Sequence, residues 1–178
     1  MDKNEELQLV NATRMLHDEK AFARLVHEYQ STVRRFFLSQ TLGDSQLSDD
    51  LAQDTFVKAY TRLNQFQGKS SFLTWLFRIA YNVFYDHTRS HRPTADLDTP
   101  TVKRRESERR DTSFRIDINE ALRQLSEQER TCVTLQLMEQ QPLEKIAEIT
   151  GMNINTVKSH VARGKKKMAD YLRANGYG

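Results

Sequence analysis

The sequence is poor in cysteine, proline and tryptophan, with one, three and one of them among 178 residues. A single cysteine, Cys132, cannot form an internal disulfide or a zinc cluster, so we expect a plain buried thiol. Apolar runs long enough to cross a membrane are lacking, as are the basic start and apolar stretch of a secretory signal. These absences predict a cytoplasmic protein without membrane insertion.

Charge of one sign is also scarce. The 27 Lys and Arg residues nearly balance the 24 Asp and Glu residues, which leaves a net charge of +3. Such a small excess indicates no partner by itself, but its distribution does. Five basic residues lie together near the C-terminus: Lys158, Arg163, Lys165, Lys166 and Lys167. The C-terminal region is therefore predicted to have one basic side.

Apolar residues recur with helical spacing over most of the chain, and we predict an all-α fold. Two stripes precede residue 64, one formed by Phe22, Leu25, Val26, Tyr29, Val33, Phe36 and Phe37, the other by Leu51, Phe56, Ala59, Tyr60 and Leu63. Ser48, followed by two acidic residues, is predicted to cap one helix, and a further helix is predicted from Ser71 to Phe84. The spacing of Trp75 favours packing in the core over base stacking.

Helical periodicity fails in residues 91–115, which hold two prolines and alternating charges but few apolar residues. We predict a flexible linker there. The alternative is a surface helix over residues 103–110, which would have no apolar face to bury. The expected organisation is a helical domain over residues 1–90, the linker, and a second helical domain over residues 116–178.

The second domain has the parts of a helix-turn-helix. Ser126 and Glu129 form a predicted capping box that starts one helix. Pro142 suits the first position of the next helix, LEKIAEIT, which Gly151 is predicted to end in a left-handed turn. Asn153 is predicted to cap the last helix.

The last helix is predicted to read duplex DNA, because the second helix of such a motif enters the major groove. Val157 and Val161 would hold it on the preceding helix, and Arg163 could bind guanine bidentately. The residues expected to face DNA are Asn155, Thr156, Lys158, Ser159, Ala162, Arg163 and Lys165. The alternative is a merely solvated basic face. Gly164 costs about 1 kcal/mol relative to alanine in a helix, which suggests close approach to DNA or to a neighbouring helix.

Two stretches of the first domain are more specific. SDDLAQDTFVKAYTRL, residues 48–63, is followed by NQFQGKSSFLTWLFRIAYNVFYDHTRSHR, residues 64–92. Together with TVKSHVARGKKKM near the C-terminus, they resemble the extracytoplasmic-function (ECF) sigma factors of bacterial RNA polymerase, over nearly all of residues 20–172. Two features differ from the family pattern. His160 stands where Arg or Lys is common, and the helix that closes the first domain has a less basic end.

The resemblance implies that the first domain traps unpaired bases of the minus-ten promoter element, for which aromatic, small polar and cationic groups are suited. The residues it implicates in this pocket or on the strand's backbone are Gly68, Lys69, Ser70, Ser71, Arg78, Asn82 and Arg89. The basic helix would then read the minus-thirty-five element as duplex.

The resemblance also implies binding to core RNA polymerase, through the clamp helices of its largest subunit and the flap of its second-largest subunit. A polar, acidic helix face suits such a contact. Its residues are Asp49, Asp50, Gln53, Asp54 and Lys58. An anti-sigma factor is a further expected partner, and no metal, cofactor or catalytic residue is expected.

Two other functions compete with an initiation factor. A stand-alone repressor or activator would explain the helix-turn-helix but leaves FQGKSSFLTW unexplained. A metal-dependent nuclease built around His87 and His91, which lie four residues apart, lacks a supporting carboxylate motif.

Overall fold

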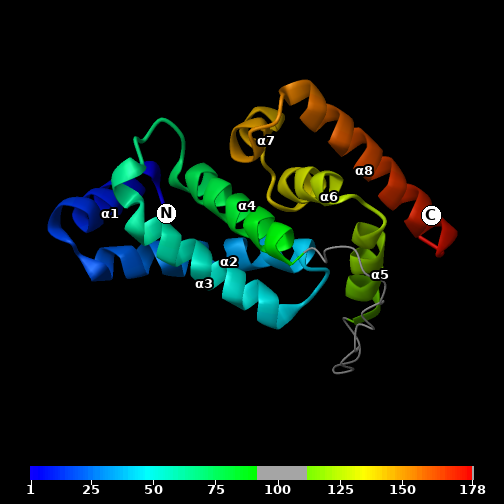
Figure 1. Ribbon diagram of the computed structural model, residues 1–178, viewed down its shortest axis with the longest axis horizontal. Coiled ribbons are helices and arrows are strands. Elements are labelled where there is room, and N and C mark those ends of the chain that lie inside the picture. Colours follow the sequence, from blue (N-terminus) through cyan, green and yellow to red (C-terminus); the bar gives the residue numbers. More distant parts are fainter. Residues whose placement is uncertain (92–111, 178) are drawn as a thin grey trace.

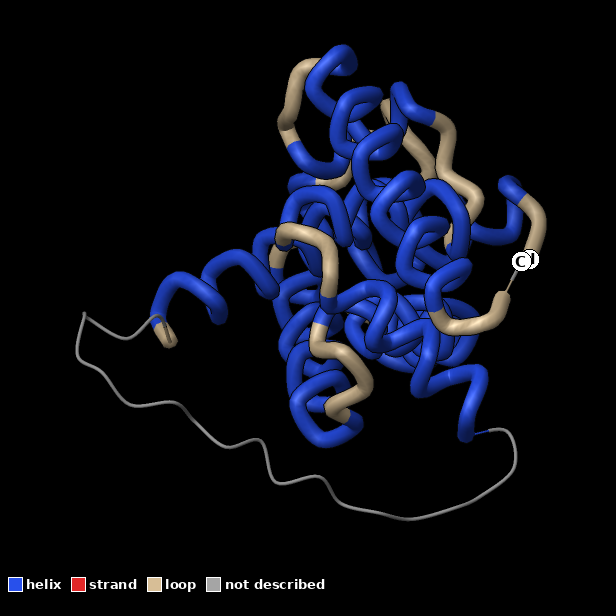
Figure 2. Tube along the Cα trace, turned by 90° about the vertical axis from the view of Figure 1, so that its right-hand side faces the viewer, coloured by secondary structure: helices blue, strands red, loops and turns tan. Residues whose placement is uncertain are grey.

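The computed structural model describes residues 1–91 and 112–177, with side chains from residue 117 onward in the second part, and helices are the only regular elements in these residues. The first domain contains α1 (Lys3–Leu16), α2 (Glu19–Gln40), α3 (Ser45–Thr61), the short 3-10 helix η1 (Leu63–Gln65) and α4 (Phe72–Ser90). The second contains α5 (Thr112–Arg123), α6 (Glu127–Val133), the π-helical turn η2 (Thr134–Met138), α7 (Leu143–Thr150) and α8 (Ile154–Ala174). The all-α prediction and its two helical domains are confirmed (Figures 1 and 2).

Most of the predicted linker, residues 92–111, lies outside the described residues, as does the alternative helix over residues 103–110. The helix expected from residue 116 begins earlier, at Thr112. The predicted division between the two domains therefore stays a prediction.

Short polar side chains begin the helices of the first domain. Asp18 accepts hydrogen bonds from the backbone at the start of α2, and Asp44 accepts one from Leu47 N at 2.9 Å at the start of α3. The prediction that Ser48 caps this helix is wrong. Gly43, with φ +90°, turns the chain so that Asp44 is extended and reaches the exposed N–H first. Ser48 is buried one turn later, where its hydroxyl donates to Asp44 O at 2.6 Å.

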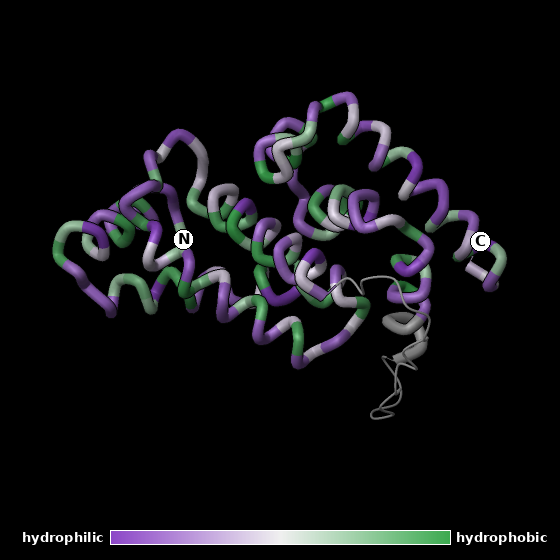
Figure 3. The backbone as a smooth tube through the Cα atoms, in the orientation of Figure 1, coloured by the Kyte–Doolittle hydropathy of each residue, from purple (hydrophilic) through white to green (hydrophobic). Residues whose placement is uncertain are grey.

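Apolar stripes meet in the core, where Phe36, Phe37, Phe72 and Phe77 are fully buried. Figure 3 shows hydrophobic residues interleaved with hydrophilic ones along the helices, as amphipathic packing requires. Trp75 is half-buried, with its ring centroid 5.4 Å from that of Phe66 and 5.6 Å from that of Phe72. It therefore packs against the core, as its spacing predicted.

Cys132 is buried, as predicted. Burial raises the pKa of its thiol to about 12, because the apolar surroundings disfavour the thiolate. The thiol is therefore unreactive at neutral pH.

The two domains pack against each other through α2 and α4 on one side and through α6, η2 and α7 on the other. Arg35 of α2 forms a bidentate ion pair with Glu139, at 2.7 and 2.6 Å. Thr131 of α6 donates to the side-chain oxygen of Gln40 at 3.0 Å, and Arg130 donates to the Gln40 backbone oxygen at the same distance. The interface thus joins α2 to residues about a hundred positions later in the sequence.

Candidate functional site

The helix-turn-helix lies in α7 and α8. Gly151 ends α7 with φ +73°, in the left-handed region, and Asn153 caps α8 by accepting from Asn155 N at 2.8 Å. Val157 and Val161 are buried against the rest of the domain. These predictions are confirmed, except that Pro142 is the cap of α7 and not its first helical residue.

The residues predicted to face DNA are all exposed on the outer side of α8, namely Asn155, Thr156, Lys158, Ser159, Ala162, Arg163 and Lys165. His160 differs from them because only 9% of it is exposed. Its Nδ1 lies 3.1 Å from a terminal nitrogen of Arg163. Burial lowers the pKa of His160, and the charge of Arg163 lowers it further, so the imidazole is neutral at physiological pH.

Gly164 is buried where α8 packs tightly against α6. A methyl group at this position would lie 2.5 Å from Val133 Cγ2 and 3.2 Å from Leu125 Cδ2. The sequence left open whether this glycine serves contact with DNA or with a neighbouring helix. The structure assigns it to packing against α6 and against Leu125, which lies just before that helix.

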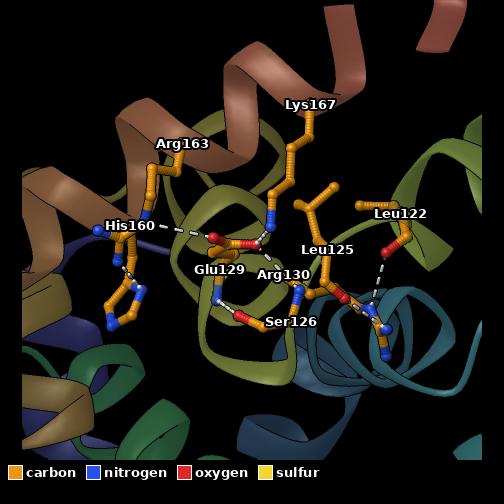
Figure 4. Close-up of polar contacts among 8 residues, drawn as sticks. All are labelled: Leu122, Leu125, Ser126, Glu129, Arg130, His160, Arg163 and Lys167. Atoms are coloured by element: carbon orange, nitrogen blue, oxygen red, sulfur yellow. Dashed lines mark hydrogen bonds and ion pairs between the residues drawn. The ribbon is translucent and has the colours of Figure 1, made fainter. Parts of the chain in front are cut away.

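Beneath α8, the carboxylate of Glu129 forms ion pairs with two basic residues of that helix (Figure 4). Lys167 Nζ lies 2.7 Å from one carboxylate oxygen, and Arg163 Nε lies 3.4 Å from the other. The same side chain completes the predicted capping box with Ser126, which is confirmed. The sequence identified Glu129 only as a cap, because its contacts to α8 join residues 34 and 38 positions apart.

In the first domain, the loop before α4 brings together small polar and cationic groups. Gly68 has φ +69°, Lys69 is exposed, and Ser70 is half-buried. Ser71 is the cap of α4 and accepts from Thr74 N at 3.1 Å. The Ser71 hydroxyl therefore caps a helix, a structural role that the sequence did not predict for it.

Both ends of this loop are held by α1, a feature that the sequence did not predict. Arg14 donates to Phe66 O at 3.4 Å. Glu6 accepts from Phe72 N at 3.1 Å and also from the hydroxyl of Tyr29. Burial, and then the hydrogen bond to Glu6, raises the pKa of Tyr29, so its hydroxyl stays protonated and donates. The helix α1 thus fixes the loop from both sides.

Three predicted residues of α4, Arg78, Asn82 and Arg89, are exposed and lie four and seven positions apart, which places them along one side of the helix. Arg78 and Ser70 also face Glu148 of α7. The hydrogen bond from Lys145 lowers the pKa of Glu148 most, and Ser70 and the charge of Arg78 lower it further. Part of the predicted minus-ten surface therefore lies against the second domain in this structure.

The predicted polymerase-binding residues lie along α3. Asp49, Asp50, Gln53 and Asp54 are exposed, whereas Lys58 is half-buried, 3.9 Å from Asp86. Asp49 also forms an ion pair with Arg34 of α2 at 2.5 Å. These contacts place one charged side of α3 at the surface.

Beside this face lies an apolar groove of about 600 Å³ between α2 and α3. Phe22, Val26, Val57 and Tyr60 supply apolar parts of its lining, and Asp49 and Gln53 lie at it too. Val57 is 57% exposed and Tyr60 is 39% exposed. The sequence placed Tyr60 in a core stripe, because helical spacing does not distinguish a residue in the core from one that lines a groove.

His87 and His91 stack on each other with ring centroids 4.1 Å apart. His91 Nδ1 lies 2.9 Å from the backbone oxygen of His87. This nitrogen is therefore engaged in a contact at the end of α4. Among the described residues, no cluster of three or more His, Cys, Asp or Glu side chains could hold a metal ion. The same part of the chain has no helix long and apolar enough to cross a membrane.

Comparison with known families identifies two matching segments. The family Sigma-70 region 2 matches residues 25–94, and Sigma-70, region 4 matches residues 115–168. The chain is 31% identical to the RNA polymerase sigma-H factor of Pseudomonas aeruginosa, over 88% of this chain and 88% of that protein. It is 33% identical to the ECF RNA polymerase sigma-E factor of Escherichia coli K12, over 84% of this chain and 85% of the relative.

Two solved structures share the arrangement of helices. One is the sigma factor RpoE of Bartonella quintana in complex with the anti-sigma factor NepR, with a TM-score of 0.70 and 26% identity, over 86% of this chain and 98% of that chain. The other is CnrH in complex with the cytosolic domain of CnrY, with a TM-score of 0.72 over 98% of this chain and 99% of that chain. At 22% identity, the second likeness supports the fold alone.

Proposed function

Because this chain belongs to the ECF sigma factors of bacterial RNA polymerase, which are transcription initiation factors and not enzymes, we propose that it directs core polymerase to promoters with two separate reading surfaces. The second domain reads the minus-thirty-five element as duplex. The first domain opens and reads the minus-ten element. Membership of this family also sets aside the stand-alone repressor and the nuclease.

The outer face of α8 is the observation that carries this proposal. Val157 and Val161 anchor the helix inward, while seven residues of the types that contact phosphates or base edges point outward. Lys158 and Lys165 suit phosphate contacts, and Arg163 suits a guanine. An α-helix with one anchored side and one polar side fits the width of the major groove.

For the minus-ten element, the loop before α4 and the exposed side of α4 supply complementary parts. Gly68, Lys69 and Ser70 form a small polar surface for an unstacked base, and Asn82 is exposed further along α4, the helix that follows this loop. Arg78 and Arg89 would neutralise phosphates of the opened strand. The anchoring of the loop by α1 supports this role, because a base pocket requires a fixed backbone.

Core polymerase would bind at α3. The acidic residues Asp49, Asp50 and Asp54 would orient basic groups of the clamp helices of the largest subunit, and the apolar groove beside them would bury side chains of the same partner. The second domain would contact the flap of the second-largest subunit. Such a factor acts where transcription occurs, in the cytoplasm.

An anti-sigma factor is the further partner that we propose. The relative from Bartonella quintana was solved with such a protein bound, at 26% identity to this chain. A regulator that covered the α2–α3 groove would exclude polymerase, since the groove residues Val57 and Tyr60 would be buried beneath it.

The test is transcription in vitro with core polymerase and genomic DNA fragments. The purified chain should start transcription at a defined set of promoters, and mapped start sites should share two elements at fixed spacing. Asp54→Ala should lower binding to core polymerase while leaving promoter preference unchanged. Sequence-specific duplex binding by the chain, without any transcription when core polymerase is added, would contradict the proposal.

A further inference from the structure

Glu129 is a charged residue buried under the helix that is proposed to read DNA. Only 5% of its side chain is exposed. Burial acts to raise the pKa of its carboxyl group, but hydrogen bonds from Lys167, the Ser126 backbone and Arg163 outweigh burial and lower the pKa below its ordinary value. Glu129 is therefore a carboxylate at neutral pH, held between α6 and α8.

The capping role of Glu129 does not need this charge. The cap requires an oxygen that accepts from Ser126 N, here at 3.0 Å, and glutamine supplies the same oxygen at this position of a capping box. The charge instead meets Lys167 and Arg163, which lie one turn apart on the same side of α8. The carboxylate thus has a second role beyond the cap.

We propose that Glu129 is a positioning residue for minus-thirty-five recognition, which fixes the guanidinium of Arg163 and restrains Lys167 from nonspecific contact with phosphates. This inference rests on the proposed function, because it concerns how α8 selects a DNA sequence. A guanidinium carries five N–H donors, and Glu129 engages only the one on Nε. The terminal N–H groups that His160 does not occupy remain for a base, and a rigid fork favours bidentate binding.

His160 supports the same guanidinium from the other side. In the tautomer that is protonated on Nε2, its Nδ1 accepts from a terminal nitrogen of Arg163 at 3.1 Å. Arg163 is thus held at two points, and 57% of its side chain is still exposed. This arrangement gives a role to the histidine that stands where a cation was expected, since a second cation there would repel Arg163 instead of holding it.

Glu129→Gln tests the proposal, because it keeps the cap and removes only the charge. The full chain would be assembled with core polymerase and presented with a promoter pool randomised over the minus-thirty-five element. Discrimination at the base read by Arg163 is expected to fall about fivefold to tenfold. Binding to unrelated duplex should tighten, with a salt slope steeper by up to about 0.9 for each cation released. Glu144→Gln on α7 removes the same charge at an exposed position and should change neither quantity.

A double mutant separates positioning from general charge. In an Arg163→Ala background, Glu129→Gln should cause no further loss of discrimination, because the group through which it acts is gone. Unchanged discrimination in Glu129→Gln alone, with wild-type holoenzyme selecting a clear element, would overturn this inference only. Wild-type holoenzyme that selects no element would overturn the proposed function.

Should Glu129→Gln lose its helical circular dichroism, His160→Leu gives the second test, because leucine has no acceptor for Arg163. It leaves the capping box and the carboxylate in place and removes the other support of Arg163. Discrimination is expected to fall while the salt slope stays unchanged. Wild-type discrimination in a folded His160→Leu variant would then overturn the inference.

Discussion

Gly164 is a helical glycine for which alanine should destabilise the fold. In an open helix, exchange of glycine for alanine stabilises by about 1 kcal/mol. Here the added methyl group would lie 2.5 Å from Val133 Cγ2, so α6 and α8 would have to move apart. Overpacking of this kind costs about 1–3 kcal/mol. We expect Gly164→Ala to lower the free energy of unfolding in urea, by up to about 2 kcal/mol once the helix gain of about 1 kcal/mol is subtracted from the overpacking cost.

The contact with Val133 also provides a control. Val133→Ala alone should destabilise by leaving a cavity, but combined with Gly164→Ala it should cost less than the sum of the two single changes. A stabilised Gly164→Ala variant would instead mean that α8 has room at this position and that Gly164 serves a contact outside the domain.

At the scale of the elements, two adjacent serines at the start of α4 have different roles. Ser71 caps α4, whereas Ser70 lies in the loop, half-buried and near Glu148. Ser71→Ala should therefore lower the free energy of unfolding by about 1 kcal/mol. Ser70→Ala should leave it unchanged and alter promoter opening, measured by permanganate reactivity of unpaired thymines in the minus-ten element.

Ser71→Asp is the matched variant for this pair. Aspartate caps a helix as well as serine does, so stability should be retained, while the added negative charge should repel the opened strand. Loss of opening together with wild-type stability would support a place for Ser71 beside DNA. Wild-type opening in both Ser70→Ala and Ser71→Asp would contradict the minus-ten surface.

Local signals in the sequence predicted most elements and the outward face of α8. Gly151, Asn153 and the capping box of Ser126 act within a few residues, so spacing alone reveals them. The prediction for Ser48 was wrong because Asp44 offers an equally good cap one turn earlier. Spacing selects a helix, but it does not say which of two neighbouring caps the preceding turn favours.

Contacts between distant residues were beyond prediction from the sequence. The hydrogen bond from Phe72 N to Glu6 spans 66 positions, and the pair of Arg163 with Glu129 spans 34. Neither leaves a periodic trace, because each depends on how whole helices pack. The same holds for the exposure of Tyr60, which depends on whether another helix covers its side of α3.

At the scale of the whole molecule, the packing of the two domains conflicts with simultaneous reading of both promoter elements. Elements named minus-ten and minus-thirty-five lie about 25 base pairs apart, or about 85 Å of duplex at 3.4 Å per base pair. In this structure, Ser70 and Arg78 of the first domain lie at Glu148 of the second. The proposed function therefore requires the domains to separate before the minus-ten surface binds DNA.

The ion pair of Arg35 with Glu139 is the contact best suited to test this separation. The Glu139 side chain is 2% exposed and that of Arg35 is 52% exposed, so a second carboxylate at position 35 would face a buried one. Arg35→Glu should open the free chain, raising its radius of gyration in X-ray scattering above the value of about 16 Å expected for a compact chain of this length. The free variant should also bind a single-stranded minus-ten oligonucleotide more tightly.

Arg34→Glu is the control for this variant. It makes the same charge change within the first domain, where Arg34 pairs with Asp49, and should stay compact. The swap Arg35→Glu with Glu139→Arg should restore compactness, and an Arg35→Glu variant as compact as wild type would show that this pair does not hold the domains together.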